Sequence, residues 1–86
     1  MTTASGATVT ASAGALHARW GQRVAEVRYS VGKSQTRLAA DAGLSRGQVW
    51  RIETGRSAPS DSARIRIAAA LNTTPADLFT YDEAAA

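Results

Sequence analysis

The chain has 86 residues, which is enough for one small domain with a modest core. The absence of cysteine and the single histidine exclude a disulfide scaffold, thiolate metal sites and a histidine-rich metal site. Ten Lys and Arg residues against seven Asp and Glu residues give a formal net charge of +3. No stretch approaches the ~20 apolar residues of a membrane-spanning helix. A catalytic pocket would be cramped in so short a chain, so we expect a binding protein.

The two ends differ in composition from the middle. Residues 1–15 are mostly Thr, Ala, Ser and Gly and carry no charged side chain. Such a segment has little apolar surface to bury, so we expect a disordered, flexible leader. It lacks the basic start and the apolar run of a secretory signal. Residues 82–86 are expected to form a fraying tail, which leaves 16–81 as the folded domain.

The predicted domain is more basic than the whole chain. Residues 16–81 contain all ten basic residues and five of the seven acidic ones, a net charge of +5. Such an excess on a small surface suggests a polyanionic partner, with nucleic acid the first choice. The charge alone is equally compatible with a role in solubility.

The first two predicted helices follow from apolar spacing and end signals. Spacings of four, four and three residues mark the stripe of the first helix: Leu16, Trp20, Val24 and Val27. That pattern breaks at Gly32. Ser34 is a good N-cap for a second helix, and Gly43 suits the left-handed position that ends it. The inward side of the second helix carries Leu38, Ala39 and Ala42.

Three further helices are predicted. Ser45 and Gln48 form a capping box that begins the third helix, which runs to about Thr54. Ser60 begins the fourth helix, and Asn72 tolerates the left-handed ending. The expected inward residues of the fourth helix are Ile65, Ile67, Ala68 and Leu71. A short fifth helix has Thr74, Pro75 and Asp77 in its first turn and closes with Leu78 and Phe79. The sequence therefore predicts a compact all-α domain of five helices.

The second and third helices are joined by residues 42–45, a short turn that contains a glycine. Two helices joined in this way form a helix-turn-helix unit, whose second helix can enter the major groove of DNA. The turn alone is weak evidence, because ordinary helical hairpins also use glycine.

The wider pattern is more specific. Its motifs are Ser34-Gln35, Leu38-Ala39, Ala42-Gly43-Leu44-Ser45, Val49, Arg51-Ile52-Glu53, Gly55, Pro59, Leu71 and Asp77-Leu78-Phe79. With these motifs, residues 20–79 resemble the phage-repressor (Cro/CI-type, XRE) helix-turn-helix family. The resemblance implies a lambda-repressor-like fold in which the third helix buries one side and reads DNA with the other.

Helical geometry divides the third helix in the same way. At about 100° per residue, Val49, Ile52 and Glu53 share one side. The opposite side carries Arg46, Gly47, Trp50, Arg51 and Thr54. The residues expected to read bases are Arg46, Gly47, Gln48, Trp50 and Arg51.

Each expected base contact has an alternative. Arg51 could bridge guanine O6 and N7 or be a solvated surface arginine. A cation at Arg46 opposes the helix dipole, so structure alone gives no reason for it. Gly47 could allow close backbone approach or have no role. Gln48 could contact a base or cap the helix, and we favour the capping role. Trp50 could contact a thymine methyl or the DNA backbone, cover a neighbouring helix, or bind another protein.

The resemblance implies phosphate contacts from Gln35, Ser45, Thr54 and Arg56. Gln35 opens the second helix, where free backbone N–H groups favour an anion, although it could also be an ordinary exposed residue. The resemblance also implies that Glu53 pairs with Arg28, and we assign neither residue to base reading.

We therefore expect a sequence-specific double-stranded DNA-binding transcriptional regulator, a repressor that binds a palindromic operator as a homodimer. Family analogy places the dimer contacts around Leu78–Tyr81. We expect a cytoplasmic, nucleoid-associated protein without cofactor, metal, membrane contact or small-molecule ligand, whose control could involve a separate regulatory partner protein. Phage-type, antitoxin-like and small bacterial regulators all fit.

The alternative from another class is an adaptor that keeps the fold but binds protein instead of DNA. Trp50 and Gly47 favour it, whereas Arg46 and Arg51 oppose it. We do not expect an enzyme, because the five carboxylates of the domain are scattered, without the spacing of acid–base or metal sites.

Overall fold

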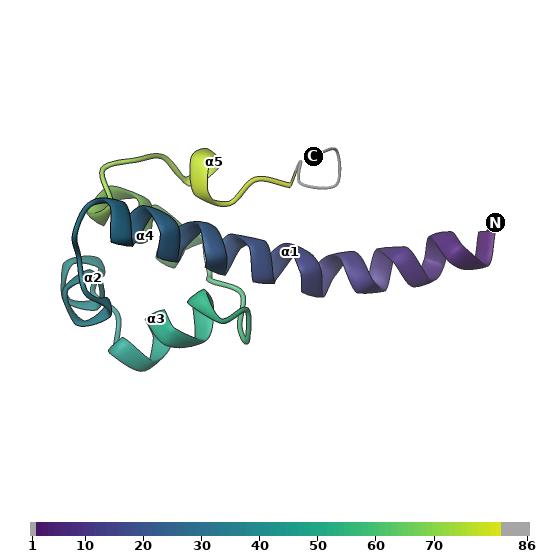
Figure 1. Ribbon diagram of the computed structural model, residues 1–86, viewed down its shortest axis with the longest axis horizontal. Coiled ribbons are helices and arrows are strands. Elements are labelled where there is room, and N and C mark those ends of the chain that lie inside the picture. The colour runs from purple at the N-terminus through teal and green to yellow at the C-terminus, as the bar shows by residue number, and fades with distance from the viewer. Residues whose placement is uncertain (1, 82–86) are drawn as a thin grey trace.

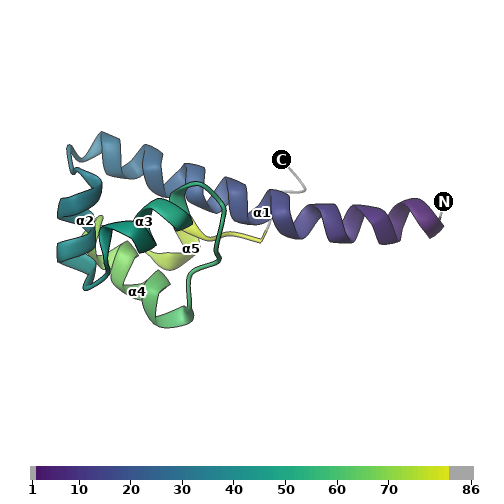
Figure 2. The same ribbon diagram turned by 90° about the horizontal axis from the view of Figure 1, so that it is seen from below.

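The computed structural model describes residues 2–81, with side chains from residue 13 onward. Its helices are α1 (Thr2–Ser30), α2 (Gln35–Ala42), α3 (Arg46–Glu53), α4 (Asp61–Ala70) and α5 (Pro75–Leu78). The described residues contain no strand. The other four helices gather along the C-terminal half of α1, while the N-terminal part of α1 extends beyond them (Figures 1 and 2). The predicted all-α, five-helix fold is confirmed.

The first helix is longer than its apolar stripe suggested. It begins at Thr2, so residues 2–15 continue the helix that the sequence placed from about Leu16 onward. No proline interrupts these residues and alanine recurs among them, which favours helical backbone. The expected flexibility of this leader stays a prediction. Met1 and the expected tail, 82–86, lie outside the described residues.

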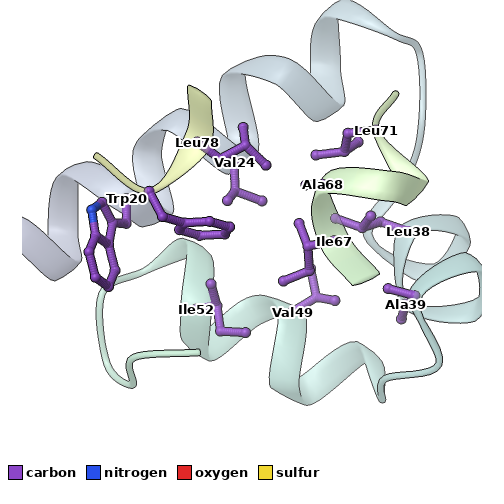
Figure 3. Close-up of a cluster of buried hydrophobic side chains, with 12 residues drawn as sticks. Trp20, Val24, Leu38, Ala39, Val49, Ile52, Ile67, Ala68, Leu71 and Leu78 are labelled. Carbon is purple, nitrogen blue, oxygen red and sulfur yellow. The ribbon is translucent and has the colours of Figure 1, made fainter. Parts of the chain in front are cut away.

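One hydrophobic cluster joins all five helices (Figure 3). Its buried residues are Trp20, Val24, Leu38, Ala39, Ala42, Val49, Ile52, Ile67, Ala68, Leu71, Leu78 and Phe79. The prediction that Ile65 faces inward is wrong, because its side chain is 61% exposed. Ile65 and Ile67 are separated by about 200° around the helix, so α4 cannot bury both against one core.

The helix ends follow the predicted caps. The side chains of Ser34, Ser60 and Thr74 each accept a hydrogen bond from the backbone N–H three residues later. Gly43 and Asn72 have φ of 67° and 59°, the left-handed conformation that their predicted positions require. These local signals set the lengths of α2 and α4, and through them the position of α3.

The packing of α3 against α1 depends on Gly21, a residue that the sequence did not mark as special. A β-carbon on Gly21 would lie 2.6 Å from the carbonyl oxygen of Glu53 and still closer to that of Ile52. The backbones of α1 and α3 therefore approach too closely for any side chain at position 21. The close approach fixes the side of α3 that faces away from the body.

Candidate nucleic-acid interface

The turn between α2 and α3 is short and held from two directions. The backbone N–H of Leu44 donates to the carbonyl oxygen of Ala39 at 2.8 Å, which closes the end of α2. From α4, the Arg66 guanidinium donates to the carbonyl oxygens of Ala42 and Gly43 at 3.1 and 3.2 Å. The turn therefore sets the direction in which α3 starts.

A capping box begins α3 where the sequence places it. The Gln48 backbone N–H donates to Ser45 Oγ at 3.0 Å, and the Ser45 backbone N–H donates to Gln48 Oε1 at 2.8 Å. The amide oxygen of Gln48 is therefore used within the helix. The expected DNA contacts of these two residues stay predictions. They rest on the donor groups that the capping box does not use, which are Gln48 Nε2 and the Ser45 hydroxyl.

A buried ion pair holds the inward side of α3. Arg28 Nε donates to Glu53 Oε2 at 2.7 Å, and Arg28 Nη2 donates to Glu53 Oε1 at 3.0 Å. The two side chains are only 6% and 5% exposed. Arg28 Nη1 also donates to the carbonyl oxygen of Lys33 at 2.9 Å. The hydrogen bonds to Glu53 raise the pKa of the Arg28 guanidinium. The pair thus links the ends of α1 and α3.

Gln35 joins the same cluster, a contact that the sequence did not predict. Its Nε2 donates to Glu53 Oε1 at 3.0 Å, so α2 is tied to the same carboxylate as α1. One amide hydrogen of Gln35 is consequently used inside the protein. Its expected phosphate contact stays a prediction that rests on the second amide hydrogen and on the backbone N–H groups of α2.

The outward side of α3 carries the residues that the sequence assigned to base reading. Arg46, Gly47, Trp50 and Arg51 are all exposed. Among the described residues, the guanidinium groups of Arg46 and Arg51 have no hydrogen-bond or ion-pair partner. Two guanidinium groups are thus presented to solvent from one helix.

Trp50 lies with its indole on the outward side of α3, and its expected roles stay predictions. Its side chain is 44% exposed, and Arg56 places its guanidinium carbon 5.0 Å from the indole ring centroid. This stacking is a cation–π contact, which the sequence did not indicate. Thr54 Oγ1 donates to the carbonyl oxygen of Trp50 at 2.8 Å, so its hydroxyl proton is used within the chain. The expected phosphate contacts of Thr54 and Arg56 stay predictions.

Several other basic side chains are paired with carboxylates. The pairs are Asp41 with Lys33 and Arg37, Asp77 with Arg23, and Asp61 with Arg64. Hydrogen bonds from Lys33 and Arg37 hold the pKa of the Asp41 carboxyl below its usual value. Within residues 13–81, no carboxylate pairs with Arg46, Arg51 or Arg56. These three arginines therefore place uncompensated positive charge at α3 and the segment after it.

Two surface hollows adjoin on this side. One is lined by Gln35, Arg46, Gly47 and Trp50. The other lies between the end of α1 and the start of α2, and it shares Gln35 and Arg46 with the first. Within the described part of the chain, no cluster of three potential metal ligands occurs. No described helix has the length and apolarity needed to span a bilayer.

A protein-family model described as a helix-turn-helix domain matches residues 19–79. The chain belongs to this family. The match spans the C-terminal half of α1 and all of α2 to α5. It confirms the resemblance that the sequence motifs indicated.

Among solved structures, the chain is similar to the restriction-modification controller protein C.AhdI from Aeromonas hydrophila. The two are 37% identical with a TM-score of 0.70, and the similarity covers 72% of this chain and 94% of that one. A comparison with curated proteins finds no significant match. Family and fold together identify this helix-turn-helix protein as a DNA-binding transcriptional regulator.

Proposed function

We propose that the protein is a sequence-specific repressor that binds a palindromic operator as a homodimer, with α3 in the major groove of each half-site. The observation that carries this proposal is the contrast within α3. One side is held by a buried ion pair, while the guanidinium groups of Arg46 and Arg51 on the other have no partner among the described residues. Such arginines suit guanine, whose O6 and N7 accept two hydrogen bonds from one guanidinium.

Affinity and specificity come from different residues in this proposal. Contacts of Arg46, Gly47, Gln48, Trp50 and Arg51 with base edges select the sequence. Phosphate contacts from Gln35, Ser45, Thr54 and Arg56 supply most of the affinity and make it dependent on salt. Arg56 is suited to this task because it lies beside the reading helix without an acidic partner in residues 13–81.

The dimer contact is assigned to the surface between α4 and α5. Family analogy placed it at Leu78–Tyr81, but Leu78 and Phe79 are buried in the core of their own chain. Tyr81 and Ile65 remain, 70% and 61% exposed, and both line a surface hollow. Two-fold symmetry would pair this surface with its copy and place the two α3 helices roughly 34–36 Å apart along DNA.

A more specific candidate is a regulator of restriction–modification genes. The similarity to C.AhdI favours it, because 37% identity extends over 94% of that controller protein. In either setting we propose a cytoplasmic, nucleoid-associated and non-enzymatic protein. Binding to the operator would repress transcription by blocking access to the promoter, and a separate partner protein could control it.

The decisive experiment is selection from a pool of random DNA duplexes at two salt concentrations. A dimeric regulator enriches a palindrome and loses affinity steeply as salt rises. If nothing is enriched and binding is weak at both concentrations, the adaptor hypothesis replaces this one.

Arg51→Ala and Arg56→Ala should separate base contacts from phosphate contacts. Loss of a bidentate guanine contact should weaken operator binding by about 1–3 kcal/mol and relax sequence choice at one position. Arg56→Ala should weaken all sequences alike and reduce the salt slope by about one. Quantitative gel-shift titrations measure both effects. Arg23→Ala is the matched control, because Arg23 pairs with Asp77. Equal, sequence-independent losses from both α3-side variants would contradict the base-reading role of Arg51.

A further inference from the structure

We propose that the hollow beside Gly47 and Trp50 receives the 5-methyl group of a pyrimidine in the major groove. The regulator would then distinguish thymine from uracil, or 5-methylcytosine from cytosine, at one position of each half-site. This inference rests on the proposed function, since it requires α3 to face DNA.

The hollow exists because position 47 has no side chain, although the fold does not require glycine there. Gly47 is not among the residues with positive φ. A β-carbon on it would meet Arg51 Nη1 at 3.5 Å and Ser45 Oγ at 3.9 Å, which are ordinary contacts. Glycine also weakens an exposed helix relative to alanine. What glycine adds at this position is open space on the outer surface of α3.

The walls of the hollow are held in place before any ligand arrives. Arg56 stacks 5.0 Å from the ring centroid of Trp50, which restrains the indole. Gln35, on the α2 side, is hydrogen-bonded to the buried Glu53 at 3.0 Å. The lining of the hollow therefore includes a restrained aromatic ring and a restrained amide.

The chemistry of the major groove determines which group fits such a hollow. Base edges there present hydrogen-bond donors and acceptors, and the apolar group among them is the 5-methyl of thymine. Methylated cytosine carries the same group at the same ring position. In a hollow otherwise lined by Gln35, Arg46 and the Gly47 backbone, the indole ring of Trp50 offers a methyl group an apolar wall. The neighbouring Arg46 favours a guanine beside the methylated pyrimidine.

The first test changes single methyl groups in the selected operator. In one arm, each thymine in turn is replaced by deoxyuridine, which removes the methyl and keeps the base pairing. In the other arm, each cytosine is replaced by 5-methylcytosine. At one position per half-site, loss of the thymine methyl should weaken binding about fourfold, the expected value of one buried methyl-sized group. If the natural base is cytosine, methylation should strengthen binding by a similar factor.

The second test connects the methyl effect to the hollow. Trp50→Ala should bring the ratio of affinities for methylated and unmethylated DNA close to one, whereas Trp50→Phe should keep most of it. Tyr29→Ala is the matched control, because Tyr29 is another exposed aromatic residue, with the Arg28 guanidinium carbon 4.5 Å from its ring centroid. That variant should leave the ratio unchanged.

Three results overturn the inference. If a palindrome is selected but no methyl change alters affinity, the hollow does not bind a methyl group. The proposed function as a regulator is then unaffected. If Trp50→Phe weakens all duplexes alike and no methyl preference exists, the indole N–H binds the DNA backbone instead. If no sequence is selected, the proposed function and this inference fail together.

Discussion

The two sides of α3 differ in how their polar groups are satisfied. On the inward side, Glu53 accepts hydrogen bonds from Arg28 of α1 and Gln35 of α2. On the outward side, the guanidinium groups of Arg46 and Arg51 have no hydrogen-bond or ion-pair partner among residues 13–81. A helix of eight residues thus combines one charge that is paired within the protein with two that face solvent.

The contrast shows how a short helix can carry a binding surface. An eight-residue helix is too short to be stable alone, so its conformation depends on its contacts with the body. The ion pair and the close approach of Gly21 provide these contacts on one side, and the capping box stabilises the N-terminus of the helix itself. The residues on the other side are then not needed for folding, and they can be suited to the DNA. Substitutions on the inward side should therefore affect stability, and those on the outward side should affect DNA binding.

The largest effect is expected from the buried ion pair. Arg28→Ala leaves the Glu53 carboxylate buried without its main partner, which should destabilise the fold by about 3–5 kcal/mol. Urea denaturation followed by circular dichroism measures the loss. The double variant with Glu53→Ala should be much less destabilised than the sum of the two single variants. Additive losses would show that the two residues are not coupled.

A smaller loss of folding stability is expected from a substitution where α1 meets α3. Gly21→Ala should destabilise the fold by about 1–3 kcal/mol, because its β-carbon would overlap backbone oxygens of α3 that cannot rotate away. Gly14→Ala provides the control within α1, since nothing lies within 4 Å of its added β-carbon. It should have no destabilising effect. Equal thermal midpoints for the two variants would contradict the close approach.

The smallest stability effect, with the opposite sign, is expected on the outward side. Gly47→Ala should stabilise the protein by up to about 1 kcal/mol, because alanine is the better helix former and the site has room for it. The same variant should bind the operator more weakly, since the added methyl occupies part of the hollow. Thermal denaturation and gel-shift titration measure the two effects. A variant that gains both stability and affinity would break the separation between the two sides of α3.

The sequence was most informative where structure depends on neighbours along the chain. The cap at Ser34 and the left-handed endings at Gly43 and Asn72 each involve only a few consecutive residues. The capping box of Ser45 and Gln48 has the same local character. Such features can be predicted because the donor, the acceptor and the turn lie within one short segment.

Contacts between distant segments were harder to predict. Gly21 looks like an ordinary glycine in a helix until the crossing of α1 and α3 is known. The hydrogen bond from Gln35 to Glu53 and the stacking of Arg56 on Trp50 depend on side-chain directions that spacing does not determine. The error at Ile65 was of another kind. Ile65 was expected to face inward because it is apolar. Its position around α4, about 200° from Ile67, already showed that the two could not share one side.

The two tryptophans occupy opposite environments, and their light emission should differ accordingly. Trp20 is buried, with its Nε1 donating to the carbonyl oxygen of Thr80 at 2.8 Å, whereas Trp50 lies on the exposed side of α3. Unfolding should shift the emission of Trp20 to longer wavelength. A ligand on α3 should change that of Trp50. One unlabelled sample can therefore report the integrity of the core and the occupancy of the surface as separate spectral signals.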